Sequence, residues 1–219
     1  MIIVALADIH DNIKRLGGIS HDLSAADVVL LVGDLTHFGG RDDASSVVRA
    51  VREYNGYILA VPGNCDYPGV DAYLTSTGIN LHRKCITVDQ IAFLGVGGSL
   101  PCPGRTPNEF TEGELRTFLA EASANLDPTM PTILVSHQPP SLTVTDLVQN
   151  GQHVGSESIR TFITQVQPIV CLTAHIHEGR GIDTIGKTQI LNPGPLKEGG
   201  YAYVEVDSQR QVEVAEIRG

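Results

Sequence analysis

Short apolar runs recur from the first residues to about residue 175, and each run ends in polar or glycine-rich residues. Their hydrophobicity is continuous rather than alternating, which is the pattern of strands in a sheet covered on both faces. The predicted buried strands are residues 1–7, 28–33, 57–63, 132–137 and 169–175. Helix-compatible stretches lie between several of them, at residues 12–24, 42–54, 111–126 and 156–167. This part of the chain therefore predicts alternating strands and helices.

The remaining segments predict strands without helices between them. Residues 81–98 have the pattern of a hairpin that turns at Asp89 and Gln90, and four short strands follow one another after about residue 181. These two patterns together predict an α/β fold of four layers, α/β/β/α, in which two mixed sheets pack face to face between helices. No repeat, low-complexity linker or change in composition divides the sequence, so we expect one domain over residues 1–219.

Charge and hydropathy exclude several classes of protein. The 219 residues include 25 acidic and 15 basic side chains, a formal net charge of −10, and no basic cluster, so we expect no broad binding to nucleic acid. No apolar run approaches the roughly 18 residues that span a bilayer, so we expect no membrane insertion. The first residues lack a basic region and are interrupted by Asp8, so they predict a strand rather than a signal peptide, and we expect a cytoplasmic protein.

The four cysteines contain no C-x-x-C pair, which argues against a zinc ribbon or a redox-active dithiol. In a reducing compartment we expect all four to be free thiols. Cys85 and Cys171 lie in strand-like runs, where we expect them to be buried as small apolar side chains.

Side chains that can bind metal ions follow five of the predicted strands. They are Asp8, His10, Asp34, Asn64, His137, His175 and His177. Ligand sites in open α/β sheets lie at the carboxyl ends of the strands, so we expect these groups along one edge. Seven nitrogen and oxygen donors are too many for one tetrahedral zinc ion and suit two divalent ions that share a carboxylate, for which Asp34 is well placed. The mixed ligand set favours manganese, iron, zinc, cobalt or nickel.

Taken in order, the motifs D-x-H, G-D, G-N-x-D, H and H-x-H resemble those of the calcineurin-like metallophosphoesterases. They extend from Asp8 to His177, which is most of the chain. That family has a double β-sandwich flanked by helices, in agreement with the predicted fold. The resemblance implies that one ion is bound by Asp8, His10 and His177. It implies that the other ion is bound by Asn64, His137 and His175, with Asp34 bridging the two.

The sequence departs from the family pattern in two places. Ala174 stands where the family usually has glycine, a small change in the turn. More importantly, residues 63–66 read G-N-C-D, whereas the family often reads G-N-H-[DE]. In relatives with histidine there, the imidazole faces the substrate and protonates the leaving group or stabilises the transition state, and a thiol is a weaker donor near pH 7. Chains with G-N-C-D resemble a small prokaryotic branch that includes phosphodiesterases active on activated diesters.

Cys65 therefore has several alternative roles. It is either a weak substitute for the usual acid, a small side chain tolerated in the turn, a metal-bound thiolate, or a thiol that is oxidised beside a redox-active metal. Asp66 is expected to orient a neighbouring group by a hydrogen bond. With Asp34 and Asn64, these two residues complete the predicted catalytic set.

Other polar residues near the motifs are candidates for contacting substrate. His37 follows Asp34 by three residues, and His153 precedes the predicted helix start at Ser156, whose backbone N–H groups can receive a phosphate oxygen. Asn12 is as well explained as a helix cap, and we interpret Arg105 and Asn108 as ordinary surface residues.

Together these residues predict a metal-dependent phosphoesterase, and a phosphodiesterase rather than a monoesterase. A hydroxide bridging the two ions would attack phosphorus in line while the ions take up the developing charge. We expect a small phosphorylated substrate, selected by the long loops at residues 98–110 and 138–155. The sequence does not decide between a monomer and a homo-oligomer.

Two alternatives to this function come from the same residues. A scaffold protein of this fold with a weakened metal site is disfavoured by the complete ligand set. Another binuclear hydrolase is disfavoured because the H-x-H-x-D-H run of metallo-β-lactamase-like enzymes is missing. An amidohydrolase would place H-x-H on an early strand, where this chain has D-x-H.

Overall fold

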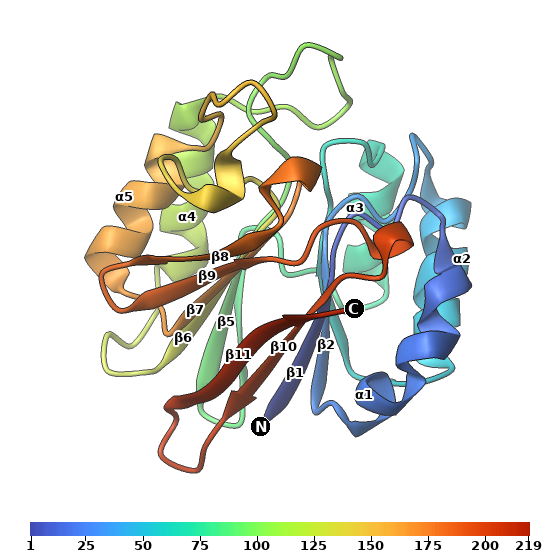
Figure 1. Cartoon of the computed structure of the whole chain (residues 1–219), viewed down its shortest axis with the longest axis horizontal. Coiled ribbons are helices and arrows are strands. Elements are labelled where there is room, and N and C mark those ends of the chain that lie inside the picture. Colours follow the sequence, from blue (N-terminus) through green and yellow to red (C-terminus); the bar gives the residue numbers. More distant parts are fainter.

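Two mixed β-sheets pack face to face in the computed structural model, which describes residues 1–219 (Figure 1). The first sheet has the strand order β11-β10-β1-β2-β3 and the second β4-β5-β6-β7-β9-β8. The strands of the first sheet are β1 (Ile2–Leu6), β2 (Val28–Val32), β3 (Ile58–Val61), β10 (Tyr201–Val206) and β11 (Val212–Arg218). Those of the second are β4 (Lys84–Val88), β5 (Ile91–Val96), β6 (Thr132–Ser136), β7 (Val170–Thr173), β8 (Gly181–Ile185) and β9 (Thr188–Asn192).

Helices cover the outer face of each sheet, so the predicted four-layer fold is confirmed (Figure 1). The first sheet is covered by η1 (Ile13–Ile19), α1 (Ser20–Ala25), α2 (Arg41–Arg52) and α3 (Pro68–Ser76). The second is covered by α4 (Glu112–Ser123) and α5 (Glu157–Val166). Three single 3₁₀ turns lie in the connections, η2 (Val144–Asp146), η3 (His177–Gly179) and η4 (Leu196–Glu198). None of the helices has both the length and the apolar character needed to span a bilayer.

The buried faces of the strands explain the continuous apolar runs. In β1, Ile3 and Ala5 face the core between the two sheets, whereas Val4 and Leu6 face the core under the helices. Successive side chains of a strand point to opposite faces, so a strand with a core on each side must be apolar at every position. The central strands β1, β2 and β3 run parallel, as do β5, β6, β7 and β9, and their carboxyl ends therefore meet at common edges.

The hairpin predicted at residues 81–98 is confirmed as β4 and β5, with Asp89 and Gln90 in the turn. The helix predicted at residues 12–24 is instead a 3₁₀ segment followed by one short α-helix, since Gly17 and Gly18 interrupt it. Helix α3 was not predicted from the sequence; it is short and begins at Pro68, a residue well suited to a first helical turn.

The late strands divide between the two sheets. β8 and β9 form a hairpin in which β9 also pairs in parallel with β7 of the second sheet. β10 and β11 form a hairpin in which β10 also pairs with β1 of the first sheet. The chain thus crosses between sheets after Asn192, and the late strands do not form one continuous meander.

One expectation about the cysteines is wrong. All four are free, and Cys171 is buried as predicted, but Cys85 is exposed. Cys85 lies on β4, which is an edge strand of the second sheet. Most side chains of β4 are exposed, unlike those of the central strands.

Candidate metal centre

The seven candidate ligands converge at the carboxyl ends of strands from both sheets. Asp8 and His10 follow β1, Asp34 follows β2 and Asn64 follows β3, so the first sheet provides four of them. The second sheet provides the other three, which are His137 after β6 and His175 and His177 after β7. A cavity of about 480 Å³ opens at this edge and is lined in part by His10, Asp34, Asn64, His175 and His177.

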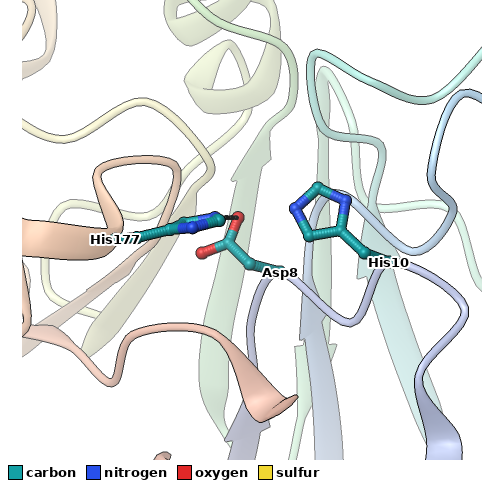
Figure 2. A group of neighbouring side chains, drawn as sticks. All are labelled: Asp8, His10 and His177. Atoms are coloured by element: carbon teal, nitrogen blue, oxygen red, sulfur yellow. Dashed lines mark ion pairs between the residues drawn. The ribbon is translucent and has the colours of Figure 1, made fainter. Parts of the chain in front are cut away.

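Asp8, His10 and His177 form one group (Figure 2). The Asp8 carboxylate lies between the two imidazole rings, and one of its oxygens is 3.7 Å from Nε2 of His177. Asp8 has no exposed surface, and its carboxylate beside His177 raises the pKa of that imidazole. Nδ1 of His10 is 3.3 Å from the carbonyl oxygen of Thr36, which leaves Nε2 to face the centre. This group therefore presents one carboxylate and two imidazole nitrogens to a common point.

Asp34 lies between this group and the remaining ligands. Its Oδ2 is 3.7 Å from Nε2 of His10, and its Oδ1 is 3.6 Å from Nε2 of His137. The backbone N–H of Cys65 donates to Oδ1 at 2.8 Å and fixes the carboxylate in this orientation. Burial raises the pKa of Asp34 to about 6, and the neighbouring charge of Asp8 adds to the shift. One carboxylate oxygen thus faces each half of the site.

Asn64, His137 and His175 form the second half. Nδ1 of His137 lies 2.8 Å from the carbonyl oxygen of Val32, and a carbonyl can only accept, so Nδ1 carries the proton. Nε2 of the same ring then offers a lone pair, yet it lies 2.9 Å from Oδ1 of Asn64, which also offers a lone pair. Burial lowers the pKa of His137 and lowers that of His175 to about 3, so both rings are neutral. The rings of His137 and His175 lie 5.3 Å apart.

These residues fit divalent metal ions. Two lone pairs facing each other are unfavourable unless a cation lies against both, and the contact between Asn64 and His137 is of that kind. Two ligands at bond lengths of about 2.1 Å and at right angles to one another lie about 3 Å apart, which matches the observed separation. Neutral imidazole, the state that burial favours for His137 and His175, is also the state in which histidine binds metal.

The backbone at the candidate ligands is strained. Four of them adopt left-handed conformations that are rare for residues other than glycine, with φ values of 47° at Asp8, 46° at His10, 48° at Asp34 and 70° at His175. Such conformations cost of order 1–3 kcal/mol each and persist only where the surrounding structure imposes them. Their concentration at one edge of the sheets marks this edge as the functional region.

Two glycines allow the strand ends to approach each other this closely. A Cβ atom on Gly63 would lie 2.1 Å from both the backbone nitrogen and Oδ1 of Asp34. Gly33 has a φ of 86°, and a Cβ there would lie 2.2 Å from Nδ1 of His137. Any side chain at either position would displace a candidate ligand, so both positions require glycine.

Asp66 holds two of the ligand loops together. It is fully buried, and its carboxylate accepts hydrogen bonds from the backbone of Leu35, Thr36 and Gly63 and from the Thr36 hydroxyl, at 2.7 to 3.2 Å. It therefore orients its neighbours through hydrogen bonds and joins the turn after β2 to the turn after β3. Asp66 does not line the cavity.

Cys65 and His37 line the cavity, together with Asn12 and Lys197. The ring of His37 lies 5.5 Å from that of His10. Burial raises the pKa of the Cys65 thiol, and the charges of Asp34 and Asp66 raise it further. The side chain of Asn12 also accepts a hydrogen bond at the start of η1, as expected for a cap.

The structure does not place His153 among the cavity-lining residues. Its Nδ1 lies 2.7 Å from Oδ1 of Asp146, a buried carboxylate that also accepts from the backbone N–H groups of Leu142, Thr143 and Gly155. Asp146 thus organises the loop at residues 138–155, and His153 packs against that organising carboxylate.

Lys197 was not found from the sequence. It is the one lysine or arginine side chain that lines the cavity, and it lies in η4. The backbone N–H of Leu196 donates to the carbonyl oxygen of Ala7 at 3.0 Å, which places η4 beside the end of β1. The only sequence signal was the run N-P-G-P, residues 192–195, which begins at the last residue of β9 and turns the chain back toward the site.

Comparison with known proteins identifies the family of this chain. Residues 1–179 match the model of the calcineurin-like phosphoesterase family, and the chain belongs to that family. It is 39% identical over 201 residues to the uncharacterized protein MJ1162 of Methanocaldococcus jannaschii, an alignment that covers 89% of this chain and 88% of that protein. The family supports assignment to the metal-dependent phosphoric ester hydrolases, for which the ligand groups described above are suited.

Two solved structures share the fold. The crystal structure of TT1561 from Thermus thermophilus is similar with a TM-score of 0.74 and 20% sequence identity, covering 100% of this chain and 98% of that one. The structure of an archaeal phosphodiesterase is similar with a TM-score of 0.54 and 14% identity over the whole of both chains.

Proposed function

We propose that this protein is a phosphodiesterase that hydrolyses small phosphodiesters with good leaving groups at a centre of two divalent metal ions. The observation that carries the proposal is the position of Asp34, which turns one carboxylate oxygen to His10 and the other to His137. A carboxylate with one oxygen for each of two ligand groups is what a shared ligand between two ions requires.

In this proposal Asp8, His10 and His177 hold one ion, and Asn64, His137 and His175 hold the other. When bound, such ions supply a nucleophilic water at neutral pH and positive charge for the phosphoryl oxygens. The chain contributes the orientation of the ligands. The carbonyl of Val32 holds the His137 ring with Nε2 toward the centre, and the Cys65 N–H holds the Asp34 carboxylate.

The preference for good leaving groups follows from Cys65. Cys65 is 8% exposed and lines the cavity at the position where many family members have histidine. Because burial and two carboxylates raise the pKa of the thiol, it stays protonated and is a poor proton donor near pH 7. A leaving group that is stable as an anion, such as an aryl oxide, departs without such help.

Lys197 would contribute to binding the substrate. The whole chain carries a net charge of −10, and this ammonium group is the one lysine or arginine charge that lines the cavity. A phosphodiester has a single negative charge on its phosphoryl oxygens, which an ammonium group can contact as a point charge.

Hydrolysis of a bis-aryl phosphate by the metal-loaded protein tests this proposal. The protein is prepared with manganese, iron, zinc, cobalt or nickel, and the number of bound ions per chain is measured before the assay. We expect two ions per chain and faster hydrolysis of the diester than of the matching aryl monoester. Full occupancy without hydrolysis of any phosphodiester would refute the proposal. A single ion or an empty site would favour a scaffold role for the fold.

A further inference from the structure

The side-chain amide of Asn64 is held by the loop at residues 98–110. Its Nδ2 donates a hydrogen bond to the hydroxyl oxygen of Thr106 at 3.1 Å. The opposite end of the same amide, Oδ1, faces His137. An amide group offers donors at one end and an acceptor at the other, so the direction in which it is held decides whether it can bind a metal ion.

Glu109 decides the direction of this hydrogen bond. Its Oε1 accepts from the Thr106 hydroxyl at 2.9 Å and from the Thr106 backbone N–H at 2.7 Å. The backbone and the thiol of Cys102 donate to the same oxygen at 3.3 and 3.1 Å. Partial burial opposes ionisation of Glu109, but these hydrogen bonds outweigh it and lower the pKa to about 2. Glu109 is therefore a carboxylate, which accepts hydrogen bonds and donates none.

The single hydroxyl proton of Thr106 is thus committed to Glu109. Toward Asn64 the hydroxyl can only accept, so the amide must present its NH₂ group to Thr106 and its oxygen to the centre. The reversed amide would place its oxygen against a lone pair of Thr106 and its NH₂ group against the metal ligands.

The same loop also fixes the backbone around Asn64. The N–H of Asn108 donates to the carbonyl of Asn64 at 3.1 Å, and its side-chain amide donates to the carbonyls of Gly63 and Asp66 at 3.2 and 3.0 Å. The turn that carries Asn64 is therefore attached to the loop at four points, three through Asn108 and one through Thr106.

We propose that Thr106 and Glu109 are positioning residues that orient the Asn64 amide for metal binding. This inference rests on the proposed function in one respect, the role of Asn64 as a ligand of the second ion. It makes the loop at residues 98–110 part of the metal site as well as a candidate substrate loop. Removing a residue that hydrogen-bonds to a metal ligand typically weakens metal binding 10- to 100-fold.

Metal titration of Thr106→Val tests the inference. Valine keeps the shape of threonine but lacks the hydroxyl. We expect wild-type protein to bind two Mn²⁺ ions, and the variant to bind the first with unchanged affinity and the second about 10-fold more weakly. Calorimetry gives the affinities, and the spin-coupled electron paramagnetic resonance signal of a manganese pair reports the second ion without any assay of activity.

Three further variants keep the experiment decisive. Thr106→Ser retains the hydroxyl and should bind both ions as wild type does, whereas Glu109→Leu cannot accept from Thr106 and should weaken the second ion. Thr117→Val is the matched control, because Thr117 is an exposed residue of α4 whose hydroxyl donates only to the carbonyl of Gly113. If Thr106→Val fails to fold, Glu109→Leu alone decides.

The outcomes separate the two proposals. Wild-type affinity for both ions in Thr106→Val or in Glu109→Leu would overturn the orienting role and leave the proposed function intact. A wild-type protein that binds fewer than two ions would overturn the proposed function, and the orienting role with it.

Discussion

Nε2 of His137 lies 2.9 Å from Oδ1 of Asn64, although the two atoms both offer lone pairs. The carbonyl of Val32 holds the proton of the imidazole on the far side of the ring, so a hydrogen bond cannot relieve this contact. A cation that contacts both atoms removes the repulsion. The folded protein therefore presents ligand atoms for a metal ion at this place, and we expect metal binding to stabilise the fold.

Removal of metal should destabilise the protein. A ligand at 100 times its Kd stabilises the native state by about 2.7 kcal/mol for one site, and for a chain of this size 1 kcal/mol corresponds to a shift in Tm of about 2–4 °C. We expect a chelator to lower the Tm by about 5–10 °C or more and the addition of Mn²⁺ to restore it. A Tm that is the same with and without each of the five candidate metals would contradict the proposed centre.

Asp34→Asn should stabilise the metal-free protein at neutral pH. The pKa of Asp34 in the folded state is about 6, above the ordinary value of about 3.9, so the folded state holds the proton more tightly than the unfolded state. Stability then falls as the pH rises from about 4 to about 6, and the loss is complete above that range, at about 3 kcal/mol.

Because asparagine is neutral at every pH in this range, the variant should not lose stability as the pH rises. Urea unfolding of chelated wild type and variant at pH 4 and pH 8 measures the difference. We expect the variant to be more stable at pH 8 and the gap to shrink at pH 4. A variant less stable than wild type at pH 8 would show that the charge of Asp34 is compensated without metal.

Cys65→His should increase turnover of substrates with poorer leaving groups. An imidazole at this position can donate a proton near pH 7, and a positioned general acid contributes up to about 10²- to 10⁴-fold. Rates on aryl and alkyl phosphodiesters, measured at equal metal content, test this. Cys85→His is the matched control, because Cys85 is an exposed cysteine on β4. An unchanged or lower rate for the alkyl diester would count against this account of Cys65.

Lys197→Gln should weaken substrate binding more than it slows the chemical step. The ammonium group lines the cavity and is exposed, so we expect KM for an aryl phosphodiester to rise by about 10-fold, with a smaller fall in kcat. The effect should be larger for a monoester, which carries more charge. Lys187→Gln, in the turn between β8 and β9, provides the control. A variant whose KM equals that of wild type would exclude a contact between Lys197 and phosphate.

The predicted buried strands were accurate because local sequence determines them: a strand with a core on each face must be apolar throughout, as Ile3 and Val4 illustrate. The pairing of the strands was harder to predict from the sequence. Nothing local distinguishes β9, which pairs with β7, from β10, which pairs with β1, because the choice depends on contacts with strands far away in the sequence.

The candidate ligands were visible for a similar reason, since each one lies at the end of a predicted strand or within three residues after it. Lys197, Thr106 and Glu109 were missed because they lie in segments without a motif, and only tertiary structure brings them to the cavity edge or to Asn64. His153 was predicted as a substrate contact from its position before a helix, but a local carboxylate, Asp146, takes up its ring nitrogen.

The division of the seven ligands between the two sheets has a consequence for the stability of the protein when metal is scarce. Neither half of the chain holds a complete set, because Asp8, His10, Asp34 and Asn64 come from the first sheet and His137, His175 and His177 from the second. The complete site would therefore form only when the two sheets have packed together, and the bound ions would add to the apolar core that joins them. In a cell that lacks the metal, the protein would be inactive and would also unfold more easily and be degraded by proteases. Scarcity of the metal would then lower the amount of the protein as well as its activity.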